Sequence, residues 1–388
     1  MAYYFLFPEI DTTLYSQPDR KETNTGADEI LEIVKERGST DNILYPSRIL
    51  IKFKNEDLTN LVNDTIGSST YNNSTTKVNL QLTAAEPKNL LATVNLNLFA
   101  ISQSWDEGTG RYTNLPSSSN GASWIYRNNT TTATTWATAS FAANSTGSIS
   151  GGLINQGGGV WYTDSNFQAT EQYLVGDSLD TNFDVKTIVT KWYNFNQNSS
   201  TYPTGIENNG FLIKKPEIIE TNTSHSFGEL QYFSVDTHTI HPPKLTFKWD
   251  DSTGYDDVDS SKLKTTQDNL QITLYQNKNT YNQNDIATFR LNVRDKYPTR
   301  TFATSSNYLD VNYIWSSSCY SIRDAHTEQE VIPFDSNFTK LSADSNGNYF
   351  KIYMNGLQPE RYYRILFKQH DATGTIIYDD NYHFKVIR

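Results

Sequence analysis

Residues 104–163 decide the fold. They begin with SWDEGTGRYTN at residues 104–114, continue with GASWIYRN at residues 121–128 and end, after a tract of Ser, Thr, Ala, Asn and Gly, with GGGVWYT at residues 157–163. Aromatic side chains pack well on a pleated sheet, whereas glycine and short polar residues favour turns. The stretch therefore predicts strands connected by long polar loops.

The composition of the whole chain has the same character. Only 36% of the 388 residues are hydrophobic, yet 13% are aromatic, with 25 Tyr, 19 Phe and 7 Trp. This balance favours strands over helices. The length is sufficient for two domains, each with a sizeable core. We therefore predict an all-β protein of two domains.

Charge and cysteine content exclude several classes of protein. The net charge is −11 and no basic run occurs, which argues against a partner with a phosphate backbone. The single cysteine, Cys319, cannot form an intramolecular disulfide. No apolar run approaches the roughly 20 residues that span a bilayer, and the N-terminal sequence does not resemble a signal peptide. We expect synthesis in the cytosol and no membrane span.

Hydrophobic periodicity locates the main elements of the first domain. Residues 48–54 have a period of two, which predicts a strand with Ile49, Ile51 and Phe53 on one face. Residues 94–99 alternate in the same way. The sequence FDVKTIVTKWYN at residues 183–194 predicts a strand that enters a short helix. Between these elements, residues 128–160 form a low-complexity insertion.

A second domain follows an acidic linker. Residues 250–266 hold five aspartates and almost no apolar side chain, which is typical of a linker. Residues 267–388 contain short alternating strands separated by turn signals. This spacing predicts an immunoglobulin-like sandwich.

Taken in order, the motifs of residues 3–249 resemble the DNRLRE-type, carbohydrate-binding-module-like β-sandwich of bacterial and phage surface proteins. The resemblance rests on DTTLY, TNTG, RILIKF, SWDEGTG, ASW, FDVKTIVTKW, NNGFLIKKPE and PPKLTFKW. It implies a jelly-roll-like sandwich over residues 1–249, in which Trp105, Gly108, Gly110 and Trp124 are structural signature residues. The long insertion and the Asn-rich loops depart from the family pattern and put its glycan contacts in doubt.

The C-terminal domain carries a second resemblance. Leu357, Pro359 and Tyr363 match the Leu-x-Pro-x-x-x-Tyr corner of fibronectin-type and related immunoglobulin-like domains. The tail as a whole is similar to the C-terminal domain of virion structural proteins of large marine and T4-like tailed phages. Together the two resemblances imply a virion protein made in the cytoplasm of a bacterial host.

Aromatic residues of the loops are the best candidates for binding. Sugar faces and protein partners both favour exposed Trp and Tyr, which nominates Trp136, Trp161, Tyr162 and Tyr126. Trp136 lies inside the polar insertion and is expected to reach a partner. Trp105 and Trp124 belong to the same group of aromatic residues, but for these two the favoured alternative is a place in the core.

Catalytic and metal sites are not expected. Asp106 and Glu107 are adjacent and would point to opposite faces of a strand, so they are expected to cap the turn at residues 108–110 instead. His238 and His241 lack further ligands nearby, and no cofactor fingerprint occurs. Calcium at Asp106 or Asp164 stays an alternative. We expect no enzyme activity and no cofactor.

Two functions remain open from the sequence. The first is a non-enzymatic structural protein of a tailed-phage virion, in the tail, neck or collar, baseplate or fibre attachment, which binds other virion proteins as a homo-oligomer. The alternative is a carbohydrate-binding module that recognises host-surface or cell-wall glycans.

Overall fold

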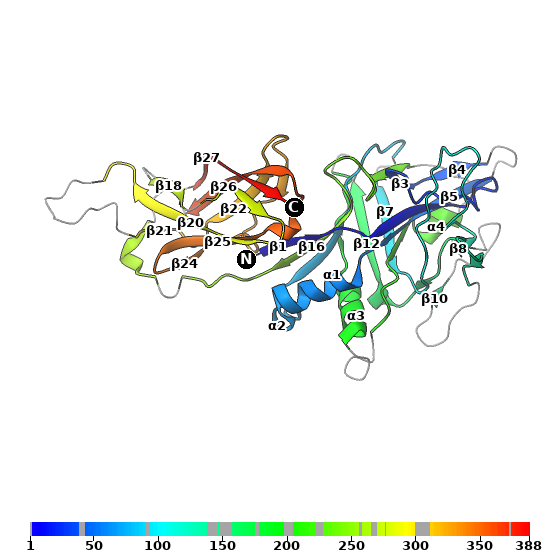
Figure 1. Cartoon of the computed structure of the whole chain (residues 1–388), viewed down its shortest axis with the longest axis horizontal. Coiled ribbons are helices and arrows are strands. Elements are labelled where there is room, and N and C mark those ends of the chain that lie inside the picture. The colour runs from blue at the N-terminus through cyan, green and yellow to red at the C-terminus, as the bar shows by residue number, and fades with distance from the viewer. Residues whose placement is uncertain are drawn as a thin grey trace. The chain divides into compact units, whose positions relative to one another are not determined.

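The computed structural model shows a chain that is mostly β, with several antiparallel sheets (Figure 1). The predicted β-rich class is confirmed. The structure describes residues 2–38, 43–90, 93–137, 146–147, 157–174, 178–197, 205–221, 228–255, 258–264, 270–275, 277–298, 311–371 and 374–388. Much of the predicted insertion at residues 128–160 lies outside the described residues.

Contacts divide the chain into two compact units. Unit 1 consists of residues 1–5, 68–77 and 247–388, and unit 2 consists of residues 6–67 and 78–246. Two short N-terminal segments therefore belong with the C-terminal part of the chain. The boundaries predicted from the sequence, at residues 249 and 267, stay a prediction.

Unit 2 is built on one antiparallel sheet. Its strands follow the order β12-β7-β14-β5-β2, and β4 also pairs with β5. The strands are β2 (Ile10–Tyr15), β4 (Lys35–Arg37), β5 (Leu44–Lys52), β7 (Thr93–Ala100), β12 (Gln168–Leu174) and β14 (Phe211–Lys214).

Strand β5 is buried on both faces, which the alternation of residues 48–54 did not predict. Ile49 and Ile51 face one side of the sheet, whereas Arg48 and Leu50 face the other, and all four are buried. Leu212 of β14 lies opposite Leu50. The second face is buried because loop tryptophans cover it, as described below.

Shorter elements make up the rest of the first 249 residues. The predicted strand and helix at residues 183–194 are confirmed as β13 and α3, and Trp192 of α3 packs on Phe211 with ring centroids 4.5 Å apart. The remaining strands are β3 (Ile30–Ile33), β6 (Lys77–Gln81), β8 (Tyr126–Asn128), β9 (Thr134–Thr135), β10 (Thr146–Gly147), β11 (Trp161–Tyr162), β13 (Phe183–Asp184), β15 (Leu230–Phe233) and β16 (Lys244–Trp249). The helices are α1 (Asn55–Asn60), a π-helix (Leu61–Ile66), α2 (Ser68–Tyr71), a 3-10 helix (Ser165–Phe167), α3 (Lys186–Gln197) and α4 (Glu217–Thr221).

Unit 1 contains two larger sheets. One has the order β18-β20-β25-β24 and the other the order β19-β27-β26-β22-β23. Their strands are β18 (Leu270–Tyr275), β19 (Thr280–Asn282), β20 (Ile286–Asp295), β22 (Cys319–Asp324), β23 (Glu330–Ile332), β24 (Ser342–Asp344), β25 (Gly347–Tyr353), β26 (Arg361–Asp371) and β27 (Gly374–Ile387). Outside these sheets lie β1 (Ala2–Leu6), β17 (Leu263–Lys264), β21 (Tyr313–Ile314) and 3-10 helices at Ser260–Lys262 and Met354–Gly356.

Aromatic rings fill the space between the two sheets of unit 1. Phe350 of β25 stacks on Tyr320 of β22 at 4.4 Å between centroids, and Phe289 of β20 lies 5.6 Å from Phe384 of β27. Aromatic pairs at such distances stabilise a core beyond the area that they bury. The abundance of Phe and Tyr in the sequence is therefore explained in this unit by packing.

The acidic segment predicted as a linker belongs to unit 1 and contacts other residues of that unit. Asn348 donates a hydrogen bond to the hydroxyl oxygen of Tyr255, and Lys264 forms an ion pair with Asp295 at 2.9 Å. Asp259 caps a 3-10 helix by accepting from the Ser261 N–H. Several of its described polar residues thus pair within the unit.

The corner expected at Leu357, Pro359 and Tyr363 has a defining hydrogen bond. Tyr363 is buried and its hydroxyl donates to the Gln358 carbonyl oxygen at 2.9 Å. Leu357, the residue before Gln358, is buried, and Pro359 is half-buried. This bond ties the start of β26 to the segment that precedes it.

We predict that Tyr363→Phe destabilises unit 1 by about 1–1.5 kcal/mol, because the buried tyrosine loses its hydrogen bond to the Gln358 carbonyl oxygen. Tyr362→Phe is the matched control, since the Tyr362 side chain is 59% exposed. Urea unfolding of both variants measures the difference. Equal stabilities for the two variants would contradict the role given to the corner.

Candidate functional site

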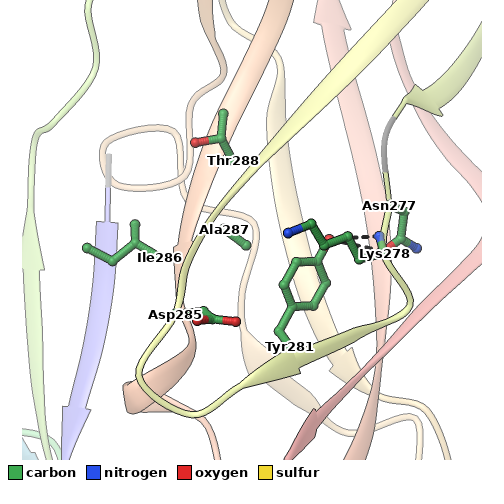
Figure 2. A pocket seen from close by; sticks show the side chains of 7 residues that line it. All are labelled: Asn277, Lys278, Tyr281, Asp285, Ile286, Ala287 and Thr288. Carbon is green, nitrogen blue, oxygen red and sulfur yellow. Dashed lines mark hydrogen bonds between the residues drawn. The ribbon is translucent and has the colours of Figure 1, made fainter.

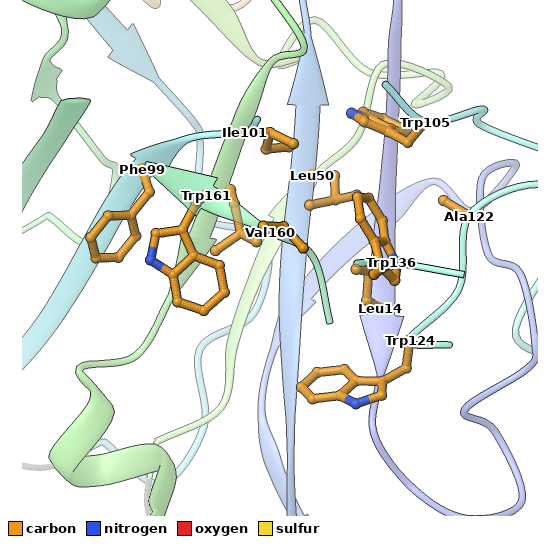
Figure 3. Close-up of a cluster of buried hydrophobic side chains, with 11 residues drawn as sticks. Leu14, Leu50, Phe99, Ile101, Trp105, Ala122, Trp124, Trp136, Val160 and Trp161 are labelled. Carbon is orange, nitrogen blue, oxygen red and sulfur yellow. The ribbon is translucent and has the colours of Figure 1, made fainter. Parts of the chain in front are cut away.

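Four tryptophans, three from loops and Trp161 from the short strand β11, cover one face of the unit 2 sheet (Figure 3). They pack on apolar side chains from four neighbouring strands. The cluster consists of Leu14, Leu50, Phe99, Ile101, Trp105, Ala122, Trp124, Trp136, Val160, Trp161 and Leu212. We refer to these residues as the tryptophan cluster.

The expectation that Trp136 reaches a partner is wrong. Its side chain is only 2% exposed, and its indole N–H donates to the Ser123 carbonyl oxygen at 2.9 Å. Trp161 is 5% exposed and packs against Phe99 at 5.6 Å between centroids. The physical reason is that the apolar face of the sheet needs a cover, and these indoles are the large apolar groups that the polar loops supply.

Trp105 and Trp124, for which a place in the core was the alternative, are 3% and 2% exposed. The Trp105 indole N–H donates to the Asn209 carbonyl oxygen at 2.8 Å. Tyr126 and Tyr162 are half-buried, and the Tyr162 ring lies 4.9 Å from that of Phe167. Of the four residues nominated as contacts, only these two tyrosines present surface to solvent.

Asn24 holds the turn at residues 108–110, a role that the sequence assigned to Asp106 or Glu107. The Asn24 side-chain oxygen accepts from the Gly110 N–H at 2.8 Å, and its amide group donates to the Ala122 carbonyl oxygen at 2.8 Å. Gly108 has φ +85°, and a Cβ there would overlap the Asn120 carbonyl oxygen. Gly110 is packed equally tightly against Asn24. The acidic residues do not cap this turn because a distant, fully buried amide already does.

A buried ion cluster lies beneath the tryptophans. Arg48 donates to both carboxylate oxygens of Glu220, from Nε at 3.2 Å and from Nη2 at 2.9 Å, and Lys214 Nζ lies 2.8 Å from the same carboxylate. All three side chains are almost fully buried. Burial lowers the pKa of Lys214. The positive charge of Arg48 lowers it further, whereas the negative charge of Glu220 acts to raise it. One carboxylate therefore balances two buried cations.

Arg48 also connects this cluster to the loops above it. Its Nη1 donates to the Gly158 carbonyl oxygen at 2.7 Å, and its guanidinium lies 4.6 Å from the Trp124 ring centroid and 5.1 Å from that of Trp161. Gly158 has φ +74°, and a Cβ there would lie 2.6 Å from Arg48 Nη1. Cation–π contacts in a desolvated site stabilise this arrangement.

An acidic groove of about 370 Å³ opens elsewhere on unit 2. Tyrosines and carboxylates dominate its lining, and Arg111 is its only basic residue. The lining residues are Tyr15, Asp28, Glu29, Ile30, Glu32, Glu36, Arg111, Tyr112 and Thr113. We refer to this surface as the acidic groove. Periodicity could not reveal it, because its walls come from three separate segments of chain.

Hydrogen bonds fix the walls of the acidic groove. The Tyr15 hydroxyl donates to Glu32 at 2.5 Å, and the Tyr112 N–H donates to Asp28 at 3.0 Å. Arg20 covers one face of the Tyr112 ring, 3.5 Å from its centroid. Burial raises the pKa of Asp28, and Glu32 adds to this effect, whereas the Tyr112 N–H opposes it. The groove thus concentrates negative charge around a half-buried tyrosine.

A second groove, of about 610 Å³, lies on unit 1 (Figure 2). It is lined by Asn277, Lys278, Tyr281, Asp285, Ile286, Ala287 and Thr288. The Tyr281 hydroxyl accepts from the Lys278 N–H at 3.1 Å, which holds the turn, and Ile286 is exposed at the edge. Its lining has no excess of one charge.

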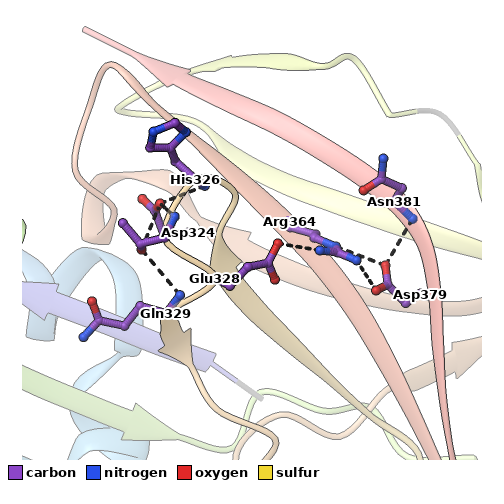
Figure 4. A network of polar contacts seen from close by, with 8 residues as sticks. Asp324, His326, Glu328, Gln329, Arg364, Asp379 and Asn381 are labelled. Carbon is purple, nitrogen blue, oxygen red and sulfur yellow. Dashed lines mark hydrogen bonds and ion pairs between the residues drawn. The ribbon is translucent and has the colours of Figure 1, made fainter.

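An ion network on unit 1 orders a turn (Figure 4). Arg364 donates to Glu328 at 2.5 Å and also pairs with Asp379. Asp324 accepts from the His326 N–H at 3.0 Å and from Arg361 at 2.8 Å. Although burial acts to raise the pKa of Asp324, hydrogen bonds from the Thr327 N–H and from Arg361 hold it below its usual range. These contacts position the turn at residues 324–329.

The other candidates have local partners. His241 stacks on Phe233 at 5.6 Å between centroids, and Asp164 caps a 3-10 helix by accepting from the Asn166 N–H at 2.8 Å. Cys319 is buried, and burial raises the pKa of its thiol. Within the described ranges, no group of three or more His, Cys, Asp or Glu side chains could hold a metal ion, and no helix is long and apolar enough to cross a membrane.

No protein-family model matches the sequence, and comparison with curated proteins gave no match. The resemblances described above therefore stay expectations that rest on their motifs.

We predict that Glu220→Gln destabilises unit 2 by about 3–5 kcal/mol, because Arg48 and Lys214 would stay buried without a counter-charge. Glu217→Gln, an exposed change in the same short helix, is the matched control and should cost less than about 0.5 kcal/mol. Chemical unfolding followed by tryptophan fluorescence measures both. A loss of stability in Glu220→Gln as small as that of the control would contradict the claim that the ion cluster stabilises the tryptophan cluster.

Proposed function

We propose that this chain is a non-enzymatic structural protein of a tailed-phage virion. It acts by protein–protein assembly, in the tail, neck or collar, baseplate or fibre attachment, and is made in the cytoplasm of the bacterial host. The motif order of residues 3–249 and the tail of residues 295–388 support this assignment. In this proposal unit 2 is a jelly-roll-like sandwich and unit 1 an immunoglobulin-like sandwich.

Two features of the packing support these sandwich types. The Tyr363 hydroxyl bonds to the backbone five residues upstream, as in a tyrosine corner. In unit 2, Trp105 and Trp124 are part of the core, and Asn24 holds the turn at residues 108–110, which agrees with a structural role for the paired-tryptophan signature.

The acidic groove is the observation that carries the assembly proposal. Four carboxylates, of Asp28, Glu29, Glu32 and Glu36, line it together with one cation, Arg111. Charge of one sign in a concave surface attracts a partner of the opposite sign and fixes its register. The occupant that fits is a basic segment of another virion protein, with Lys or Arg side chains that reach the carboxylates.

An apolar anchor stands close to the groove in sequence. Leu115, three residues after Tyr112, is 96% exposed. A leucine held out in this way costs free energy in water, and a partner that covers it recovers that cost. Aromatic residues such as tyrosine are enriched in protein interfaces, and polar groups lie mainly at the interface rim.

The alternative function is recognition of a surface glycan. The half-buried Tyr112 ring among carboxylates is the observation that favours it, because sugar faces pack on aromatic rings and sugar hydroxyls bond to carboxylates. Arg20 occupies one face of that ring, however, so only the other face could accept a sugar. Assembly therefore remains the better-supported function.

We predict that the protein is present in gradient-purified virions in a fixed copy number and forms a closed symmetric homo-oligomer in solution. Quantitative mass spectrometry of particles and light scattering of the purified chain measure the two properties. Absence from intact particles, together with a monomer in solution, would contradict the structural role.

We predict that the double variant Glu29→Lys/Glu36→Lys is folded but enters particles at least about tenfold less well, because it reverses the charge of the acidic groove. Asp57→Lys/Glu86→Lys is the control, with the same change in net charge at exposed positions outside the groove. Complementation of a deletion phage measures incorporation. If the two variants enter particles equally, the groove is not the assembly surface. Glycan-array binding that only the groove variant loses would favour the alternative.

A further inference from the structure

Side chains cover the outer edge of strand β2. The strand pairs with β5 along one edge only. On its other edge the Asp11 N–H donates to Glu107 Oε1 at 3.2 Å, and the Thr13 N–H donates to the Thr25 hydroxyl at 3.3 Å. An open edge strand can pair with other chains, and side chains that occupy its N–H groups prevent this.

Asp11 is the centre of this arrangement. Its side chain is buried, at 1% exposed, and Oδ2 accepts from the Val235 N–H at 2.7 Å. The second oxygen, Oδ1, is buried and has no hydrogen-bond partner. Asp11 and Glu107 therefore join three segments of chain: the start of β2, the loop that carries Glu107 and the segment after β15.

The charges around this pair are negative. Glu107 and Asp236 act on Asp11, and Asp236 and Glu9 act on Glu107. Burial raises the pKa of Asp11 well above its usual range, although the Val235 N–H opposes this. Burial also raises the pKa of Glu107 to about 7, against the opposing Asp11 N–H. A buried carboxylate oxygen without a donor costs free energy unless a proton neutralises the group.

We propose that Asp11 and Glu107 form a proton-operated latch, which holds the three segments together when the pair is protonated and loosens them when both carboxyl groups are ionised. The proton resides on the orphan Oδ1 of Asp11 or on Glu107, and its loss leaves both carboxyl groups negatively charged, each repelled by the other or by Glu9 and Asp236. This latch is independent of the assembly function proposed above.

The direction of the pH dependence follows from linkage. The raised pKa values mean that the folded protein binds more protons than the unfolded chain between about pH 4 and about pH 7. The stabilising contribution is complete below the unfolded pKa and is lost as pH rises through the folded pKa of Glu107, near 7. Unit 2 should therefore be less stable in mildly alkaline than in mildly acidic solution.

The test compares the melting temperature of the full chain at about pH 5.5 and about pH 8.5. Tryptophan fluorescence reports mainly on unit 2, which holds five of the seven tryptophans. Glu107→Gln and Asp11→Asn mimic the protonated groups and keep the acceptor oxygens for the Asp11 and Val235 N–H groups. Asp106→Asn, at the neighbouring residue, is the matched control.

We expect Glu107→Gln to melt as the wild type does at the lower pH and roughly 2–4 °C higher at the upper pH, so that the pH dependence flattens. Asp106→Asn should keep the wild-type profile. A Glu107→Gln profile parallel to that of the wild type overturns the latch. A rise in the wild-type melting temperature at the upper pH on addition of calcium also overturns it, because it would show that a metal ion binds in place of the proton.

Infrared difference spectra of wild type and Asp11→Asn at neutral pH provide a second readout. They should show a protonated carboxyl band, and its absence also overturns the latch.

Discussion

The bidentate ion pair between Arg48 and Glu220 is the interaction on which the arrangement of unit 2 depends. It lies on the covered face of the sheet, where an unpaired guanidinium would be prohibitively costly. The same guanidinium bonds the Gly158 carbonyl and lies against the rings of Trp124 and Trp161. One buried charge therefore specifies where glycine-rich and polar loops, which have little apolar content of their own, settle on the sheet. The tryptophans bury the apolar face of the sheet, and the ion pair fixes where the loops lie on it.

This arrangement assigns the tryptophans a structural role in place of the binding role expected from the sequence. Because the indoles of the tryptophan cluster are committed to the core, the surface that unit 2 offers to partners is made from other residues. The acidic groove, with its carboxylates around Tyr112, is the surface that we propose binds a partner. The latch at Asp11 and Glu107 lies close in sequence to one wall of that groove, since Glu107 precedes Arg111 and Tyr112 in the same loop. A rigid core with polar, charged recognition surfaces suits a protein that acts by assembly.

Composition and periodicity were sufficient to predict the β-rich class and the strand and helix at residues 183–194, whereas the corner at Tyr363 was expected only from the resemblance of its motif to that of fibronectin-type domains. They failed at Trp136, because a local pattern of Ser, Thr and Asn does not reveal that the loop lies over an apolar sheet face. They also missed Asn24, which caps a turn more than eighty residues away, and the acidic groove, whose walls come from separate segments. Each failure concerns a contact between distant parts of the chain. Local residue patterns carry no information on such contacts, which is also why the alternation of residues 48–54 did not predict that β5 is buried on both faces.

The measurement that tests the central claim most directly is hydroxyl-radical footprinting of the folded chain, read residue by residue by mass spectrometry. The claim is that the tryptophan cluster is core and not a binding surface. Trp105, Trp124 and Trp136 should then be oxidised far more slowly than the exposed Tyr275 and Tyr297, and should become equally reactive only on unfolding. Oxidation of Trp136 in the native protein at the rate of these exposed tyrosines would contradict the account.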